Sequence, residues 1–255
     1  MPAASPRGRA EPVPPSAVSR PAASLHLRET EHAIGATPDI LGPLSPPQRR
    51  QVEDLAVRLS FKPGETVFRQ GDRHSGIYII ESGVIRSYYT GPSGREITLA
   101  YWSPGNFVGG PEIFGGSPHI WSGTAEKPTE VLQLGGAHLR GLIETMPAFA
   151  ISLFEALVHK GKCYSALIHM LGTRSVAERL AQLLLLIAQF DGTPLPDGGI
   201  VINRHLTHEE VAKMVGATRQ WVTTTLDRFR EQGLIDLHKH QIVIRNEALF
   251  VRFIG

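Results

Sequence analysis

Polar side chains that can read nucleic-acid bases are concentrated in one short segment near the carboxyl end of the chain. Arg219 can donate two hydrogen bonds to the O6 and N7 atoms of a guanine, and Gln220 can pair in a similar way with an adenine. Thr223 and Thr224 follow about one helical turn later, and a threonine can contact the methyl group of a thymine. Base reading requires such side chains to stand at the start of an exposed helix. We therefore predict that this segment binds double-stranded DNA.

The residues around this segment predict two short helices joined by a glycine turn. Thr207 and Glu210 form a capping box at the start of the first helix. Gly216 permits the tight turn, and Thr218 can cap the second helix. The inner face of the second helix would consist of Val222, Leu226 and Phe229. Two helices in this arrangement form a helix-turn-helix, and residues 234–244 predict a following β-hairpin, or wing.

The two helix starts also supply polar groups that can contact the DNA backbone. We expect Thr207, His208 and Thr218 to touch phosphates, which positions the domain without specifying a sequence. An ordinary cap or a solvated surface position is the alternative for each of them, and a helical hairpin that only packs is the alternative for the pair. The predicted DNA contacts are Thr207, His208, Thr218, Arg219, Gln220, Thr223 and Thr224.

Two sequence stretches resemble the CRP/FNR superfamily of bacterial transcription regulators. The segment GATRQWVTTTLDRFREQGLI, residues 216–235, resembles its recognition helix, where a Ser/Thr-Arg pair opens the helix and a Leu-Ile pair follows it. The segments KPGETVFRQGD and GIYIIESGVIRSY, residues 62–72 and 76–88, look like the start of its cyclic-nucleotide-binding-type β-roll. The resemblance implies a ligand-responsive, homodimeric regulator, not an enzyme. Such a dimer binds a near-palindromic operator with half-site centres about 34 Å apart, and RNA polymerase is a further partner if it activates transcription.

The coarse pattern of the chain predicts an α+β fold with a β-roll, a long helix and a winged helix-turn-helix. Residues 61–134 contain short β-runs separated by glycines, which favours an antiparallel roll or jelly roll. The first residues are rich in proline and poor in apolar periodicity, which is typical of disorder. We expect a disordered tail over 1–40, an effector-sensing β-roll over 41–146, a dimerisation helix over 147–171 and a DNA-binding domain over 172–255.

The predicted long helix has two apolar stripes. One alternates spacings of four and three, typical of a coiled-coil seam, and consists of Phe149, Leu153, Ala156, Lys160, Cys163, Leu167 and Met170. In the resembled superfamily this helix is the dimer axis, so we assign this stripe to the dimer interface and expect the second stripe to cover the roll. A core helix would also be apolar on two sides. Cys163 would pack there, with an intersubunit disulfide or the sensing of oxidation as the alternative.

The effector is predicted not to be cyclic AMP. Cyclic-AMP receptors hold the cyclic phosphate with a Gly-Glu-Leu turn and an Arg-Ser pair, and a buried phosphate needs such a cation. The corresponding positions here hold Gly110 and the pair Ile120-Trp121. The remaining candidates suggest an apolar or aromatic pocket with a few polar groups, and routine packing or surface exposure is the alternative for each. They are Arg86, Glu112, His119, Trp121, Tyr164 and Ser165.

Other sensing chemistries are limited by the composition. An iron–sulfur cluster needs four thiolates, and the chain has one cysteine. Haem needs one or two axial ligands, and His119 is the best placed of the 11 histidines, so a haem-based redox or gas sensor stays as an alternative. A regulator that binds DNA constitutively, with a vestigial pocket, is another. A cupin-like metalloenzyme would need clustered histidines, and the predicted roll contains His74 and His119 alone.

The whole-chain composition sets further bounds. The formal net charge of +2 means that any DNA affinity comes from local placement of cations, not from bulk charge. The apolar run 183–188 is far shorter than the ~20 residues of a membrane-spanning helix. The amino terminus lacks the apolar core of a signal peptide, and one cysteine excludes an intramolecular disulfide. We therefore expect a cytoplasmic protein that does not enter the membrane.

Overall fold

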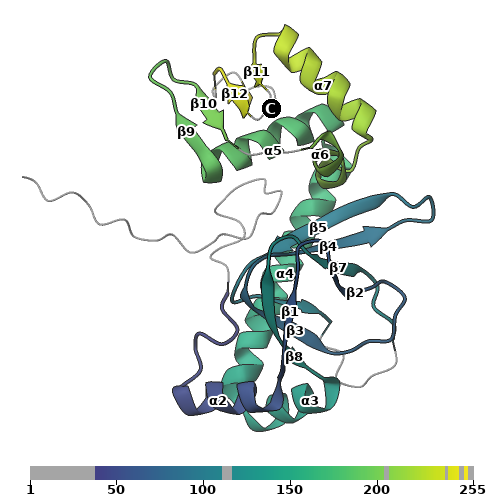
Figure 1. Cartoon of the computed structure of the whole chain (residues 1–255), viewed down its shortest axis with the longest axis vertical. Helices are drawn as coiled ribbons and strands as arrows, with labels where there is room; N and C mark the ends of the chain where they lie inside the picture. Colours follow the sequence, from purple (N-terminus) through teal and green to yellow (C-terminus); the bar gives the residue numbers. More distant parts are fainter. Residues whose placement is uncertain (1–37, 111–116, 204–206, 239–240, 247–249, 252–255) are drawn as a thin grey trace, which may run out of the picture.

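The computed structural model of the chain describes residues 38–110, 117–203, 207–238, 241–246 and 250–251. In these residues two antiparallel sheets form a β-roll, a long helix lies along the roll, and a smaller carboxy-terminal domain contains further helices and a third sheet (Figure 1). This arrangement confirms the predicted α+β fold with a roll, a long helix and a winged helix-turn-helix. The expected tail falls almost entirely outside the described residues.

The roll follows one short helix, α2 (Pro46–Leu55), in which Ser45 and Gln48 form a capping box at the first turn. Its strands are β1 (Val57–Phe61), β2 (Thr66–Phe68), β3 (Ile77–Ser82), β4 (Ile85–Thr90), β5 (Glu96–Trp102), β6 (Phe107–Gly109), β7 (Ser122–Ala125) and β8 (Thr129–Leu134). One sheet has the order β1-β8-β3-β6 and the other the order β2-β7-β4-β5. Successive side chains of a strand point to opposite faces. Thr98 and Trp102 of β5 are therefore buried in the roll, whereas Tyr101 packs against the carboxy-terminal domain.

Two helices follow the roll, α3 (Gly136–Thr145) and α4 (Pro147–Thr173). They meet at a bend of 115°, where Pro147 starts α4 as its first residue. Within the described residues no single helix is both long and apolar enough to cross a membrane, and this bent pair passes that test only when the two helices are taken together. The bend lets α4 run back along the roll towards the carboxy-terminal domain (Figure 1).

The side of α4 that faces the roll is the stripe assigned above to the dimer interface, and that assignment is wrong. All seven side chains are buried within their own chain, with exposed fractions of Phe149 0%, Leu153 4%, Ala156 2%, Lys160 7%, Cys163 3%, Leu167 6% and Met170 0%. The apolar sheets of the roll need a cover, and this stripe supplies it. Cys163 is buried and is not part of a disulfide, so its thiol does not face a second copy as an intersubunit disulfide requires.

The carboxy-terminal domain is built on α5 (Val176–Asp191), whose start has a capping box between Ser175 and Glu178. The other elements are β9 (Gly192–Pro194), β10 (Ile200–Ile202), α6 (His208–Val215), α7 (Arg219–Glu231), β11 (Ile235–His238) and β12 (Gln241–Ile244). The strands form one antiparallel sheet of order β11-β12-β10-β9, in which β11 and β12 are the predicted wing. Apolar side chains of α5, α6 and α7 share one core with this sheet.

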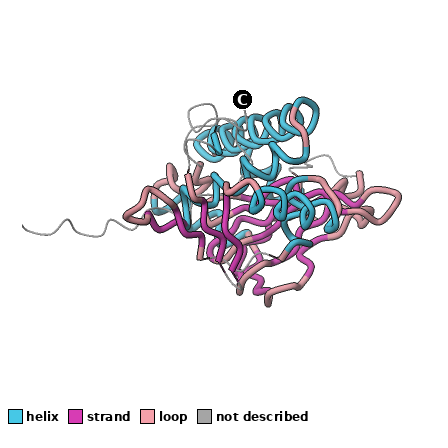
Figure 2. The backbone as a smooth tube through the Cα atoms, turned by 90° about the horizontal axis from the view of Figure 1, so that it is seen from above, coloured by secondary structure: helices cyan, strands magenta, loops and turns pink. Residues whose placement is uncertain are grey.

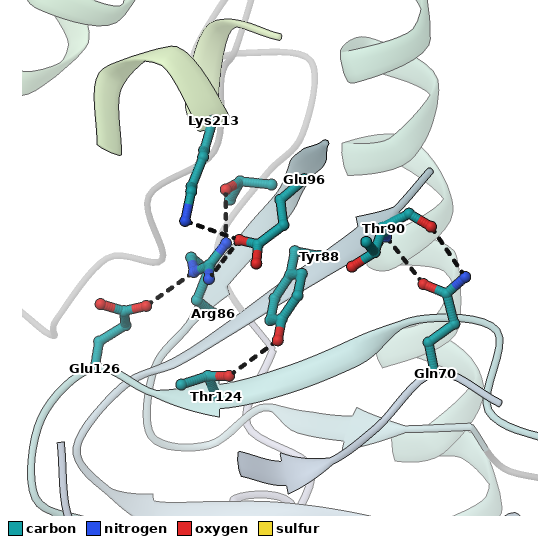
Figure 3. Close-up of polar contacts among 9 residues, drawn as sticks. Gln70, Arg86, Tyr88, Thr90, Glu96, Thr124, Glu126 and Lys213 are labelled. Atoms are coloured by element: carbon teal, nitrogen blue, oxygen red, sulfur yellow. Dashed lines mark hydrogen bonds and ion pairs between the residues drawn. The ribbon is translucent and has the colours of Figure 1, made fainter. Parts of the chain in front are cut away.

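The roll and the carboxy-terminal domain meet where β5 contacts α6. The ammonium group of Lys213 lies 3.1 Å from a carboxylate oxygen of Glu96, and the same carboxylate lies 3.0 Å from the guanidinium group of Arg86 (Figure 3). Arg95 donates a hydrogen bond to the carbonyl oxygen of Gly216, in the turn of the helix-turn-helix. Seen along the long axis, the helices lie mostly to one side of the strands (Figure 2). We call the contacts of Arg95, Glu96 and Tyr101 with the carboxy-terminal domain the domain junction.

Candidate DNA interface and effector site

Local hydrogen bonds fix both helices of the helix-turn-helix at the predicted positions. The hydroxyl of Thr207 accepts from the Glu210 amide at 3.1 Å, and the Glu210 carboxylate accepts from the Thr207 amide at 2.7 Å. Gly216 ends α6 in the left-handed conformation with φ 63° and ψ 42°, which a glycine adopts without steric cost. Thr218 then caps α7, its hydroxyl accepting from the Trp221 amide at 3.2 Å. Each of these four residues has the local role that the sequence predicts.

The packing of α7 turns its first residues outwards. Val222, Leu226 and Phe229 are buried in the domain core and fix the rotation of the helix. Arg219 and Gln220 are exposed, and neither side chain makes a hydrogen bond or ion pair with any described residue. Their donors and acceptors are thus presented to solvent at the amino end of the helix. This is the geometry that reading of base edges in a major groove requires.

The remaining predicted DNA contacts are tied into the domain by their side chains. His208 Nδ1 lies 2.8 Å from the hydroxyl of Thr223, and that hydroxyl donates to the carbonyl oxygen of Arg219 at 3.0 Å. Because the single hydroxyl proton goes to the carbonyl, Nδ1 of His208 must carry the proton of the other bond. This bond links the starts of α6 and α7. The hydroxyl of Thr224 donates to the Gln220 carbonyl at 3.0 Å, which leaves its methyl group exposed.

Two further residues of α7 belong to the same surface and are missing from the sequence prediction. Trp221 is 47% exposed, which is high for a tryptophan, and Arg228 is exposed two turns further along the helix. Together with predicted contacts they border a hollow lined by Thr218, Gln220, Trp221, Thr224, Thr225 and Arg228. The signal was available: positions 218, 221, 224 and 228 share one face at helical spacing, beside the buried face that contains Val222.

The effector candidates Trp121 and Tyr164 lie together between the roll and α4. Their ring centres are 6.2 Å apart, and the ring of Tyr164 meets the buried Trp102 edge-on at 6.3 Å. Burial raises the pKa of the Tyr164 hydroxyl well above its usual value. Trp121 and Tyr164 are therefore two effector candidates that the structure brings together. Trp102 joins the set, although the sequence prediction did not name it.

Two effector candidates with described positions, Arg86 and Ser165, are not part of this cluster. Arg86 alternates with the buried Ile85 and Ser87, so it points out of the roll, where it pairs with Glu96 and with Glu126 at 2.9 Å. Ser165 lies on the exposed side of α4. Assigning Arg86 to the effector site is therefore wrong, because strand alternation turns it out of the roll. Glu112 lies outside the described residues.

His119 is buried near the loop that connects β2 to β3. Its ring lies against His74 and Phe68, with ring centres 4.4 and 4.7 Å away, and Nε2 lies 3.2 Å from the hydroxyl of Ser75. Burial, with the neighbouring His74, lowers the pKa of His119 to about 4, although Asp72 acts in the opposite direction. His119 is thus a neutral, packed side chain near pH 7, and it would have to leave these contacts to ligate a haem iron.

The described residues contain no group of three histidine, cysteine, aspartate or glutamate side chains that could hold a metal ion. The structure therefore gives no positive support to the metalloenzyme alternative.

Two family profiles match the chain over separate segments. Residues 58–146 match the cyclic nucleotide-binding domain, and residues 178–252 match the Crp-like helix-turn-helix domain. The first match begins within β1 and ends after α3. The second begins within α5 and includes both strands of the wing.

Two relatives match over about three quarters of the chain. The chain is 28% identical over 188 residues to the global nitrogen regulator of Synechococcus elongatus, covering 73% of this chain and 84% of the relative. It is 29% identical over 194 residues to the CRP-like cAMP-activated global transcriptional regulator of Mycobacterium tuberculosis, covering 76% and 86%.

Solved structures show the same fold. A CooA mutant from Carboxydothermus hydrogenoformans superposes with a TM-score of 0.66 at 21% identity, covering 80% of this chain and 90% of that one. The c-di-GMP responsive global regulator CLP of Xanthomonas campestris superposes with a TM-score of 0.69 at 20% identity, covering 78% and 99%.

Proposed function

This chain belongs to the CRP/FNR superfamily of DNA-binding transcription regulators, which are not enzymes, and we propose that it works as a homodimer on a near-palindromic operator under the control of a small effector. The observation that carries the proposal is the exposed first turn of α7. Arg219 and Gln220 are turned to solvent there by the buried residues of the same helix. We place its action in the cytoplasm, with RNA polymerase as a further partner if it activates transcription.

The reading surface supports a specific half-site. Arg219 would take a guanine, because its guanidinium group can donate to both O6 and N7, and Gln220 would take an adenine. The exposed methyl group of Thr224 would pack on a thymine. At the positions of Gln220 and Thr224, cyclic-AMP receptors have Glu and Arg. The operator of this chain should therefore share the guanine bound by Arg219 with the operators of those receptors and differ from them at the neighbouring bases.

The test is selection of binding sequences from random double-stranded DNA, followed by affinity measurements on the selected operator. We expect Arg219→Ala to cost about 1–3 kcal/mol and to relax the preference at the guanine. Arg230→Ala is the matched control: it removes an exposed arginine from the last turn of the same helix, where Arg230 pairs with Asp227. An unchanged sequence preference in Arg219→Ala would contradict the proposed reading mode.

A dimer contact is supported by the stripe that α4 leaves exposed. Ile151, Phe154, Val158 and Ile168 are 60%, 67%, 42% and 70% exposed. With Gly161 and Ser165, both exposed, they alternate spacings of three and four along the helix. This spacing is that of a two-stranded coiled coil. Two parallel copies of α4 would bury the stripe and would set two recognition helices about one turn of DNA apart.

Control by an effector is supported by the way that α4 connects the two domains. One face of the helix closes the roll, and its carboxyl end leads directly into α5 of the reading domain. The pair Ile120-Trp121 stands where cyclic-AMP receptors have Arg-Ser, which argues against cyclic AMP. A ligand held between roll and helix would therefore bias the position of the reading domain if it bound two arrangements unequally.

A further inference from the structure

Lys160 is a buried cation on the face of α4 that covers the roll. It is 7% exposed, and its ammonium group lies 3.2 Å from the ring centre of Trp102 and 4.7 Å from that of Phe107. No hydrogen bond or ion pair joins it to any described residue. Burial removes the hydration of the ammonium group, and the cation–π contacts with the two rings compensate for only part of that lost free energy.

Other cations of the described residues do not share this position. Besides Lys160, the one buried lysine or arginine there is Arg179, which donates to the carbonyl oxygen of Leu171 in the last turn of α4. Arg86 is neutralised by two carboxylates on the outer face. The aromatic cluster under α4 thus contains one cationic group, and burial lowers the pKa of that amine well below its usual value.

We propose that Lys160, the rings of Trp102 and Phe107 that its ammonium group contacts, and the adjoining rings form a binding site for a small aromatic carboxylic acid. The adjoining rings are Tyr164, which packs on Trp102, and Trp121, which lies next to Tyr164. The carboxylate would accept hydrogen bonds from the ammonium group of Lys160, and the ring of the ligand would lie among the aromatic side chains. Trp121 and Tyr164 are half-buried, whereas Trp102 is fully buried. A ligand therefore enters from the side of Trp121 and Tyr164.

The chemistry of the site selects the ligand class. A monoanion is balanced by one ammonium group, whereas a phosphate ester with two charges would leave charge uncompensated in an apolar site. Charge-assisted hydrogen bonds are about twice as strong as neutral ones, so the acid should bind more tightly than an uncharged ligand of the same shape. Aromatic walls favour a flat ring through offset or edge-on stacking.

This inference rests on the proposed function, because the ligand would be the effector. Lys160 is on the helix that joins the sensor to the reader, so an ion pair formed there is made on the connecting element itself. Ligand binding and DNA binding are separate measurements, however, and either can fail without the other.

The experiment is isothermal titration of the full-length protein with benzoate and phenylacetate, each compared with its uncharged amide. In the wild type we expect at least one acid to bind at least about tenfold more tightly than its amide. Lys160→Met should abolish the preference for the acid while leaving amide binding unchanged. This variant should fold, since it replaces a buried amine by an apolar side chain of similar length. Lys160→Gln provides a second uncharged variant. Lys162→Met is the matched control, because Lys162 is exposed two residues further along α4.

Absence of acid binding to the wild type, equal affinities for acid and amide, or a preference that survives in folded Lys160→Met would each overturn the site. Operator affinity is then measured for the same proteins, first without any probe and then with the acid added. Failure of the wild type to bind DNA would remove the proposed function and leave the site standing. Acid binding without a change in operator affinity would keep the site but remove its role as sensor.

Discussion

At the residue scale, His119 makes the stability of the roll depend on pH. The pKa of its imidazole is lowered to about 4, chiefly by burial, from an ordinary value of 6.5. Between these values the unfolded chain binds more protons than the folded one, so stability falls as pH falls. The penalty is absent above pH 6.5 and fully developed below pH 4. We expect His119→Gln to flatten this decline in denaturant unfolding measured across that range.

The control for this prediction is His138→Gln, since His138 is exposed in α3. It should reproduce the acid-induced decline of the wild type. The variant at His119 also loses the contacts with Phe68 and Ser75, so it should be less stable near pH 7. The change in slope with pH, not the absolute stability, therefore reports on the titration. A slope equal to that of the wild type would show that His119 titrates normally.

Trp221 is the second residue whose role can be tested alone. Its side chain is half exposed on the reading face, so Trp221→Ala removes little core packing and should lower stability by less than about 1 kcal/mol. An exposed tryptophan beside the base-reading residues offers a large apolar surface to thymine methyl groups or to sugars. We expect operator affinity to fall at least about tenfold, measured by fluorescence anisotropy at fixed salt. Retained affinity would show that the DNA does not reach this side chain.

At the element scale, α4 shows which features a sequence can and cannot reveal. Caps and turns depend on neighbours in the chain, so Thr207, Gly216 and Thr218 were predictable with their roles. The rotation of α4 depends on the roll, whose apolar surface is assembled from distant strands. Both of its stripes are apolar and both have seven-residue periodicity. Nothing local distinguishes the side that covers the roll from the side that remains exposed.

Similar reasoning explains the other misplaced residues. Arg86 alternates with inward-pointing residues on β4, and the register that decides its face is set by pairing with β5 and β7. Lys160 fits the spacing of the predicted seam, but a lysine is rarely fully buried, so its sequence position does not predict a buried amine. Its burial becomes visible only once Trp102 and Phe107 are placed beneath it. The exposure of Arg219 and Gln220 at the start of α7 was predictable, since it follows from local spacing in the chain.

The exposed stripe of α4 predicts how the oligomeric state responds to mutation. Phe154→Glu places a charge on an apolar seam, where it would be buried without a partner in the dimer. Because Phe154 is 67% exposed in the single chain, the fold itself should not be affected. We expect light scattering coupled to size-exclusion chromatography to show a monomer, and operator affinity to drop at least about tenfold.

Phe154→Leu is the matched control for this prediction, as it keeps an apolar side chain at the same position and should remain dimeric. Circular dichroism distinguishes loss of the dimer from loss of the fold. A dimer that persists in Phe154→Glu would place the interface elsewhere on the chain.

At the scale of the whole molecule, the domain junction holds the carboxy-terminal domain against the roll. Glu96 accepts from both Arg86 and Lys213, and although its burial acts in the other direction, these cations hold its pKa below the usual value (Figure 3). Lys213 belongs to α6, one turn before the glycine whose carbonyl oxygen accepts from Arg95. The sensor therefore holds the first helix of the helix-turn-helix and leaves the reading face of α7 uncovered.

This arrangement predicts that Lys213→Met or Glu96→Gln loosens the junction without unfolding either domain. Both side chains are about a quarter to a third exposed, so each loss should cost well under 2 kcal/mol. Amide hydrogen exchange should become faster in α6 and at the start of β5. The double variant should exchange about as fast as the singles, because both remove the same ion pair.

The control pair is Arg140 and Glu144 in α3, which form an ion pair 2.8 Å apart away from the junction. Arg140→Met and Glu144→Gln should leave exchange in α6 unchanged. Additive effects of the two junction variants would mean that Lys213 and Glu96 act through different partners, since Glu96 also binds Arg86. Unchanged exchange in both would show that Tyr101 and the Arg95 hydrogen bond suffice to hold the domains together. Faster exchange confined to α6 and β5 would identify this ion pair as the polar link through which a change in the roll reaches the DNA-reading helix.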